Sequence, residues 1–67
     1  MTVETYTVTG MTCGHCAASV REEISEIAGV TGVDVNLETG AVTVTSDAEL
    51  ARDAVAAAVD EAGYALV

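Results

Sequence analysis

The order of hydrophobic and polar residues changes its period along the chain, and each period predicts one element. Residues 2–9 alternate and are rich in β-branched side chains, which predicts a strand with Tyr6 and Val8 on one face. From about residue 14 the apolar side chains recur every three or four positions, which predicts a helix that ends near Gly29. The apolar stripe of this helix consists of Ala17, Val20, Ile24 and Ile27.

The second half of the chain repeats these periods. Residues 33–37 and 42–44 alternate, and the segment 38–40 between them has the composition of a tight hairpin turn. Ser46, followed three residues later by Glu49, matches a capping box and predicts a helix over 47–62. The apolar stripe of this second helix consists of Ala51, Val55, Ala58, Val59 and Ala62. Gly63 then ends the helix, and residues 64–67 are predicted to form a short last strand.

The predicted order is therefore strand, helix, strand, strand, helix, strand in one domain over residues 1–67. Two βαβ units of this kind pack as a ferredoxin-like α+β sandwich, a four-stranded antiparallel sheet with both helices on one face. A chain of 67 residues buries only about 60% of its unfolded surface, so the core is thin. The core contains no Phe or Trp, and small side chains must fill it.

Composition and charge exclude several classes of function. The net charge is −9 and the only cations are Arg21 and Arg52, so a nucleic-acid partner is not expected. No segment approaches the roughly 20 apolar residues of a membrane span, and the N-terminus lacks the basic and apolar regions of a signal peptide. We therefore expect a cytoplasmic protein with no direct membrane insertion. The acidity has two interpretations, a high-salt habitat or a basic protein partner.

The candidate chemistry lies in the segment GMTCGHC, residues 10–16, which contains both cysteines of the chain. Cys13 and Cys16 are compatible with a metal site, a redox pair or a structural disulfide. A disulfide would close a very small loop and stabilise the fold little. Cys-x-x-Cys at a helix start also occurs in thioredoxin-like oxidoreductases, but this chain is shorter than those domains and has no proline.

A metal site agrees best with the position of the cysteine pair. The start of the predicted helix supplies free N–H groups and a positive dipole end, which favour thiolate over thiol. Two thiolates are soft ligands suited to Cu(I), whereas structural zinc normally takes four protein ligands. A site with two sulfurs leaves room for an incoming ligand, which suits the handover of a metal ion.

The segment GMTCGHC, together with DEAGY at residues 60–64, resembles the heavy-metal-associated domain family over essentially the whole chain. This family includes small Cu(I) chaperones and the N-terminal modules of copper-transporting ATPases. The resemblance implies that Cys13 and Cys16 are the metal ligands and that Met11 points inward and anchors the loop. It implies that Thr12 is the residue of copper-type members and that Tyr64 lies beside the metal loop, as in bacterial-type chaperones.

The role of His15 stays open between a third ligand, a contact that bridges two copies through copper, and an exposed loop residue. The resemblance implies a copper chaperone, not an enzyme, that passes Cu(I) by thiolate exchange to the heavy-metal-associated domain of a copper-transporting P-type ATPase. It would be a monomer without metal, with a copper-bridged homodimer as a further state. The alternatives are a metal-binding regulatory domain of a heavy-metal transporter and a small thiol oxidoreductase.

The net charge generates a first prediction. If the acidity reflects adaptation to salt, added NaCl will stabilise the fold, because the Debye length falls from about 10 Å at 0.1 M to about 3 Å at 1 M and screens self-repulsion. Urea unfolding followed by circular dichroism should then give a midpoint that rises with NaCl concentration. A midpoint that stays constant from low to molar salt would contradict this interpretation.

Overall fold

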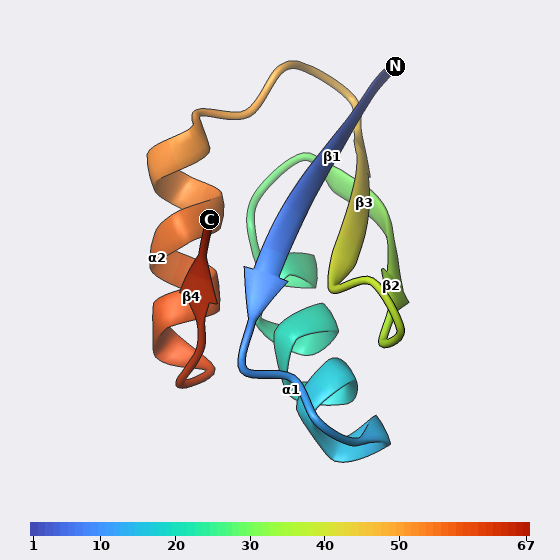
Figure 1. Cartoon of the computed structure of the whole chain (residues 1–67). Coiled ribbons are helices and arrows are strands. Elements are labelled where there is room, and N and C mark those ends of the chain that lie inside the picture. Colours follow the sequence, from blue (N-terminus) through green and yellow to red (C-terminus); the bar gives the residue numbers. More distant parts are fainter.

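The computed structural model describes all 67 residues, and its order of elements is the predicted one (Figure 1). The elements are β1 (Thr2–Thr9), α1 (Gly14–Ser25), β2 (Val30–Asn36), β3 (Ala41–Ser46), α2 (Arg52–Glu61) and β4 (Ala65–Leu66). Neither helix has the length and apolar content that a membrane-spanning helix needs.

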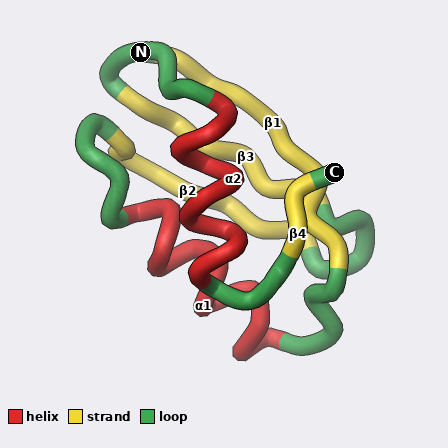
Figure 2. The backbone as a smooth tube through the Cα atoms, turned by 90° about the vertical axis from the view of Figure 1, so that its left-hand side faces the viewer, coloured by secondary structure: helices red, strands yellow, loops and turns green.

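The four strands form one antiparallel sheet in the order β2-β3-β1-β4, and both helices cover the same face of it (Figure 2). This arrangement confirms the ferredoxin-like prediction. The central pair is β1 and β3, which are in register from Thr2 opposite Ser46 to Thr7 opposite Ala41. The edge strand β4 pairs only with Val8 and Thr9, at the end of β1 where the chain turns toward α1.

The core lies between the sheet and the two helices and is built mainly from valines. Tyr6 and Val8 are both buried, as their alternation predicts. The remaining buried apolar residues come from β3, α1 and α2: Val42, Val44, Val20, Ile24, Val55, Ala58 and Val59. Each fully buried Val or Ile contributes about 1.5–3 kcal/mol relative to exposure. Without larger side chains the fold depends on many small contributions.

The predicted start of the second helix at residue 47 is wrong. Ser46 is the last residue of β3 and is only 2% exposed, and its hydroxyl donates a hydrogen bond to the carbonyl of Ala48 at 2.6 Å. It therefore cannot cap a helix. The helix begins at Arg52, after Ala51 at the N-cap, which offers no side-chain cap. Sheet pairing outweighed the local capping pattern, because it buries Ser46 opposite Thr2.

The other predicted boundaries shift by a few residues. The second strand begins at Val30 rather than residue 33, with an irregularity between Val30 and Gly32 in its pairing to β3. Leu37 lies beyond the end of this strand and is 40% exposed in the turn, so it does not extend the inner face. The first helix ends at Ser25, and a turn carries the chain to Gly29, whose φ is +92°.

The turn at 37–40 packs against the end of β1 through Gly40. The N–H of Val8 donates to the carbonyl of Gly40 at 2.8 Å, and Gly40 has φ +76°. A Cβ atom at this position would lie 2.6 Å from the carbonyl oxygen of Val8. Only glycine fits, and the turn is thereby held beside the loop that follows β1.

This contact predicts that Gly40→Ala destabilises the protein by about 2–3 kcal/mol, since it combines backbone strain with a clash against the main chain. Gly29→Ala has the same strain but open space around the new Cβ, so it should cost about 1 kcal/mol. Gly32→Ala, which has neither problem, serves as the control. Urea unfolding of the three variants should give this order, and equal effects at Gly40 and Gly32 would contradict it.

Candidate metal centre

The two cysteines lie at one end of the molecule, the lower end in Figure 1, where the loop Gly10–Cys13 connects β1 to α1. The turn at 37–40 reaches this end through the contact of Gly40 with Val8. The segment after α2 reaches it through Tyr64, whose ring lies against Gly10. Three connections that are distant in the sequence therefore surround the cysteine loop.

Cys13 is the N-cap of α1 and has an extended backbone, with φ −155° and ψ 171°. Its carbonyl accepts hydrogen bonds from the N–H groups of Cys16 at 3.1 Å and Ala17 at 3.2 Å, which closes the first turn. The two Sγ atoms come within 3.4 Å of each other, and both thiols are free. Cys13 is exposed and Cys16 is half-buried, so the pair is open on the Cys13 side.

Tyr64 is brought to the loop by the end of α2. Gly63 has φ +92° and reverses the chain, and the N–H of Tyr64 donates to the carbonyl of Val59 at 3.1 Å. A Cβ atom at Gly10 would lie 3.2 Å from Cδ1 of the Tyr64 ring. Gly10, which itself has φ +92°, thus leaves room for the ring beside the thiols.

The local hydrogen bonds lower the pKa of Cys16 from 9.0 to about 6. The largest cause is a hydrogen bond from the Tyr64 hydroxyl to the sulfur, followed by hydrogen bonds from the backbone of Thr12 and from the Cys13 thiol. The same contact with Cys16 raises the pKa of Tyr64. Cys16 is therefore a thiolate at neutral pH, which is the form that binds metal ions.

The other residues implied by the resemblance lie around this pair in different ways. Met11 is half-buried and packs against the core, which ties the loop to the sandwich. The Thr12 hydroxyl lies 4.0 Å from the Cys16 sulfur. His15 is exposed, and no group of three or more His, Cys, Asp or Glu side chains is close enough to hold a metal ion. The potential metal donors that the structure brings together are therefore the two sulfurs.

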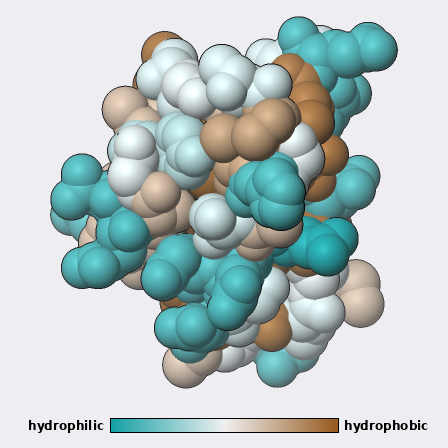
Figure 3. All heavy atoms as spheres, turned by 90° about the horizontal axis from the view of Figure 1, so that it is seen from below, coloured by the Kyte–Doolittle hydropathy of each residue, from teal (hydrophilic) through white to brown (hydrophobic).

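Charged residues are absent from two of the three connections around the cysteine loop, the third being the turn at 37–40, which contains Glu38. Residues 5–20 and 62–67 contain no Asp, Glu, Lys or Arg, although the whole chain has a net charge of −9. Figure 3 looks onto this end, where the hydrophobic (brown) areas are small and are separated by hydrophilic (teal) ones. No carboxylate from these segments competes with the sulfurs for a metal ion, which favours soft ions over hard ones.

The resemblance implied that Tyr64 lies beside the cysteine loop, and the structure has its ring there, but the packing of this ring against Gly10 was not predicted. From the sequence alone, Gly10 is only a flexible loop residue. The residues around it give no indication that an aromatic ring packs there. The partner lies more than 50 residues later in the chain. The signals for Tyr64 were the resemblance, which implied its place beside the loop, and its position directly after a helix-ending glycine.

The hydrogen bond to Cys16 predicts that Tyr64→Phe raises the pKa of Cys16 from about 6 toward 9.0, because the thiolate loses its strongest donor. The thiolate absorbance measured against pH reports this pKa directly. Tyr6→Phe removes the hydroxyl of the other tyrosine, which does not contact the thiols, and is the matched control. An unchanged thiolate titration in Tyr64→Phe would rule out this role of the hydroxyl.

Comparison with known proteins agrees with this geometry. The chain is 41% identical to the copper chaperone CopZ of Staphylococcus aureus, and the match covers all of both chains. It superimposes on a CopZ metallochaperone with a TM-score of 0.91 at 40% identity, covering 98% of this chain and 100% of that one. It also matches a copper-binding domain of HMA7, a P-type ATPase, with a TM-score of 0.90 at 26% identity, covering 100% of this chain and 92% of that one.

The full-length matches agree with a family assignment that spans both βαβ units. Residues 5–65 match the heavy-metal-associated domain, from the middle of β1 to the start of β4 and including the cysteine loop. The chain therefore belongs to the heavy-metal-associated domain family.

Proposed function

We propose that this protein is a copper chaperone that carries Cu(I) on Cys13 and Cys16. The observation that supports this most strongly is the pair of sulfurs 3.4 Å apart at the start of α1, with no third donor from the chain. Cu(I) is stable with two thiolates, whereas zinc would need further ligands. The similarity to CopZ over the whole chain supports the same metal.

Transfer would proceed by ligand exchange at the open side of the pair. A thiolate of the acceptor attacks the bound Cu(I), a three-sulfur intermediate forms, and one of the two original sulfurs leaves. Cys13 is exposed and gives the acceptor access, while Cys16 is held by Tyr64 and by the first turn of α1. No bond to carbon is made or broken, so the protein acts as a carrier and not as an enzyme.

The proposed acceptor is the heavy-metal-associated domain of a copper-transporting P-type ATPase. The similarity to the copper-binding domain of HMA7 supports an acceptor with the same fold and the same kind of site. Such a domain offers two thiolates in a matching loop, so the exchange is close to symmetric. We place this exchange in the cytoplasm, where a reducing environment keeps both thiols free.

The same likeness to an ATPase domain supports a second candidate function, a regulatory metal-binding domain within a heavy-metal transporter. The site chemistry would be the same, but the acceptor would be in the same polypeptide. The reading frame around the coding sequence distinguishes the two functions.

The two-sulfur site predicts that the reduced protein binds one Cu(I) per chain under anaerobic conditions. Cys13→Ser and Cys16→Ser should each lower the affinity by more than about 100-fold, because even the loss of an outer-shell partner costs 10–100-fold. Ala57→Ser, which adds a hydroxyl on the exposed side of α2, is the control. Competition with a Cu(I) chelator measures the affinities, and wild-type binding by both cysteine variants would refute the proposal.

Competition between Cu(I) and Zn(II) tests the choice of metal. We expect Cu(I) to displace Zn(II) completely, with X-ray absorption showing two sulfur neighbours, since the chain offers Zn(II) only half of a tetrahedral ligand set. Sedimentation of the loaded protein would show whether copper also bridges two copies. Preferential retention of Zn(II) by the reduced protein would exclude a Cu(I) carrier.

A further inference from the structure

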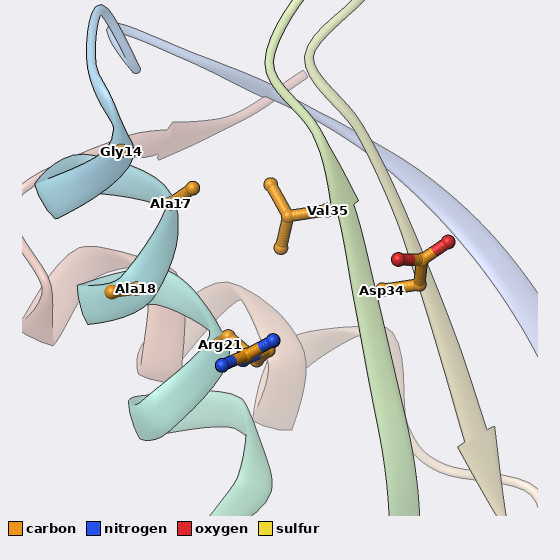
Figure 4. A pocket seen from close by; sticks show the side chains of 6 residues that line it. All are labelled: Gly14, Ala17, Ala18, Arg21, Asp34 and Val35. Atoms are coloured by element: carbon orange, nitrogen blue, oxygen red, sulfur yellow. The ribbon is translucent and has the colours of Figure 1, made fainter.

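A hollow of about 170 Å³ lies between α1 and β2, outside the cysteine pair (Figure 4). Its lining consists of small or apolar residues, one arginine and one aspartate: Gly14, Ala17, Ala18, Arg21, Asp34 and Val35. The side chain of Val35 points toward α1, whereas the carboxylate of Asp34 points away from it (Figure 4). The hollow therefore lies between Val35 and the alanines of α1, with Arg21 as its cation and the carboxylate of Asp34 directed away from α1.

Arg21 has no partner within the chain, although eleven carboxylates surround the molecule. The neighbours on its own helix, three and four positions away, are Ala17, Ala18, Ile24 and Ser25, none of which is acidic. Arg52, the only other cation, donates to the carbonyl of Val67 at 2.9 Å, while the guanidinium of Arg21 makes no hydrogen bond. Its planar donor fork is free to bind a carboxylate bidentately.

The hollow adjoins the cysteine loop. Gly14, at its upper end, lies between the two cysteines, and no atom comes within 4 Å of the place where a Cβ would be. Arg21 is seven residues further along the helix, about 10 Å from Gly14 at 1.5 Å per residue. A standard protein interface of about 800 Å² per partner has a radius of roughly 16 Å. An acceptor centred on the thiols would therefore cover this hollow.

We propose that the hollow receives an Asp or Glu side chain of the protein that accepts the metal, with its carboxylate on Arg21 and its methylene groups against Ala17, Ala18 and Val35. This inference rests on the proposed function, because it assumes an acceptor at the cysteine loop. Charge complementarity selects the occupant, since Arg21 is the one arginine whose guanidinium makes no hydrogen bond within the chain, and it lines a space that fits a short side chain.

The hollow requires a single carboxylate from the acceptor, and the acceptor as a whole need not be acidic. The net charge of −9 repels an acidic protein as a whole, so the acceptor presents this carboxylate from a surface that is otherwise uncharged or basic. An arginine in a small pocket at an interface fixes the orientation of the partner, because its planar guanidinium donates two parallel hydrogen bonds to a carboxylate that lies in the same plane. Contact between this carboxylate and Arg21 would thus determine the orientation in which the acceptor docks around the bound metal ion.

The hollow can be tested without metal by titrating the reduced protein with propionate and following amide and guanidinium signals by NMR. Propionamide, which has the same shape and no charge, is the control ligand. We expect saturable shifts confined to the lining of the hollow with propionate only. They should be lost in Arg21→Gln and kept in Arg52→Gln, which removes the same charge elsewhere. If propionate shifts the signals around Arg21 and Arg52 equally, or gives no saturable shifts, the proposal is overturned.

A second experiment measures transfer of Cu(I) to two synthetic Cys-x-x-Cys peptides that differ in one position, Glu or Gln, about 10 Å from the thiols. Arg21→Gln should slow transfer to the Glu peptide by about fivefold and leave transfer to the Gln peptide unchanged, whereas Arg52→Gln should affect neither. Equal slowing for both peptides would overturn the proposal. Stoichiometric Cu(I) binding is measured on each variant, so failure of the metal site itself is recognised separately.

Discussion

The site depends on the residue at which α1 begins. Because Cys13 is the N-cap, its sulfur lies outside the helix while Cys16 lies in the first turn, and the hydrogen bonds to the Cys13 carbonyl bring the two sulfurs together. The helix start also places free N–H groups beside both sulfurs, which stabilises negative charge there.

Residues of the second βαβ unit support the cysteine loop, which belongs to the first unit. Gly63 turns the chain so that Tyr64 contacts Gly10 and Cys16, and Gly40 seats the β2–β3 turn on the end of β1. The loop itself is held to the core mainly through Met11. A short, glycine-containing loop on a small domain is thereby supported from three sides, which holds the two sulfurs close together.

The sequence predicted the features that local patterns encode. Alternation placed Tyr6 and Val8 in the core, helical spacing placed Val20 and Ile24 there, and the cysteine spacing located the sulfurs. The start of α2 was missed because Ser46 is fixed by pairing with a distant strand and not by its neighbours. The resemblance implied that Tyr64 lies beside the cysteine loop, but its contact with Gly10 and the isolation of Arg21 depend on packing between elements, which no local pattern reports.

The absence of charge from residues 5–20 and 62–67 affects the cost of contact between proteins. Carboxylates at the metal end would have to lose their hydration whenever another surface closed over the sulfurs, and that dehydration is expensive unless each charge finds a partner. Here Glu38 is the only carboxylate in the three connections around the cysteine loop, and it lies outside these two segments. A strongly acidic molecule can therefore offer a surface beside its sulfurs that another protein could cover at little dehydration cost.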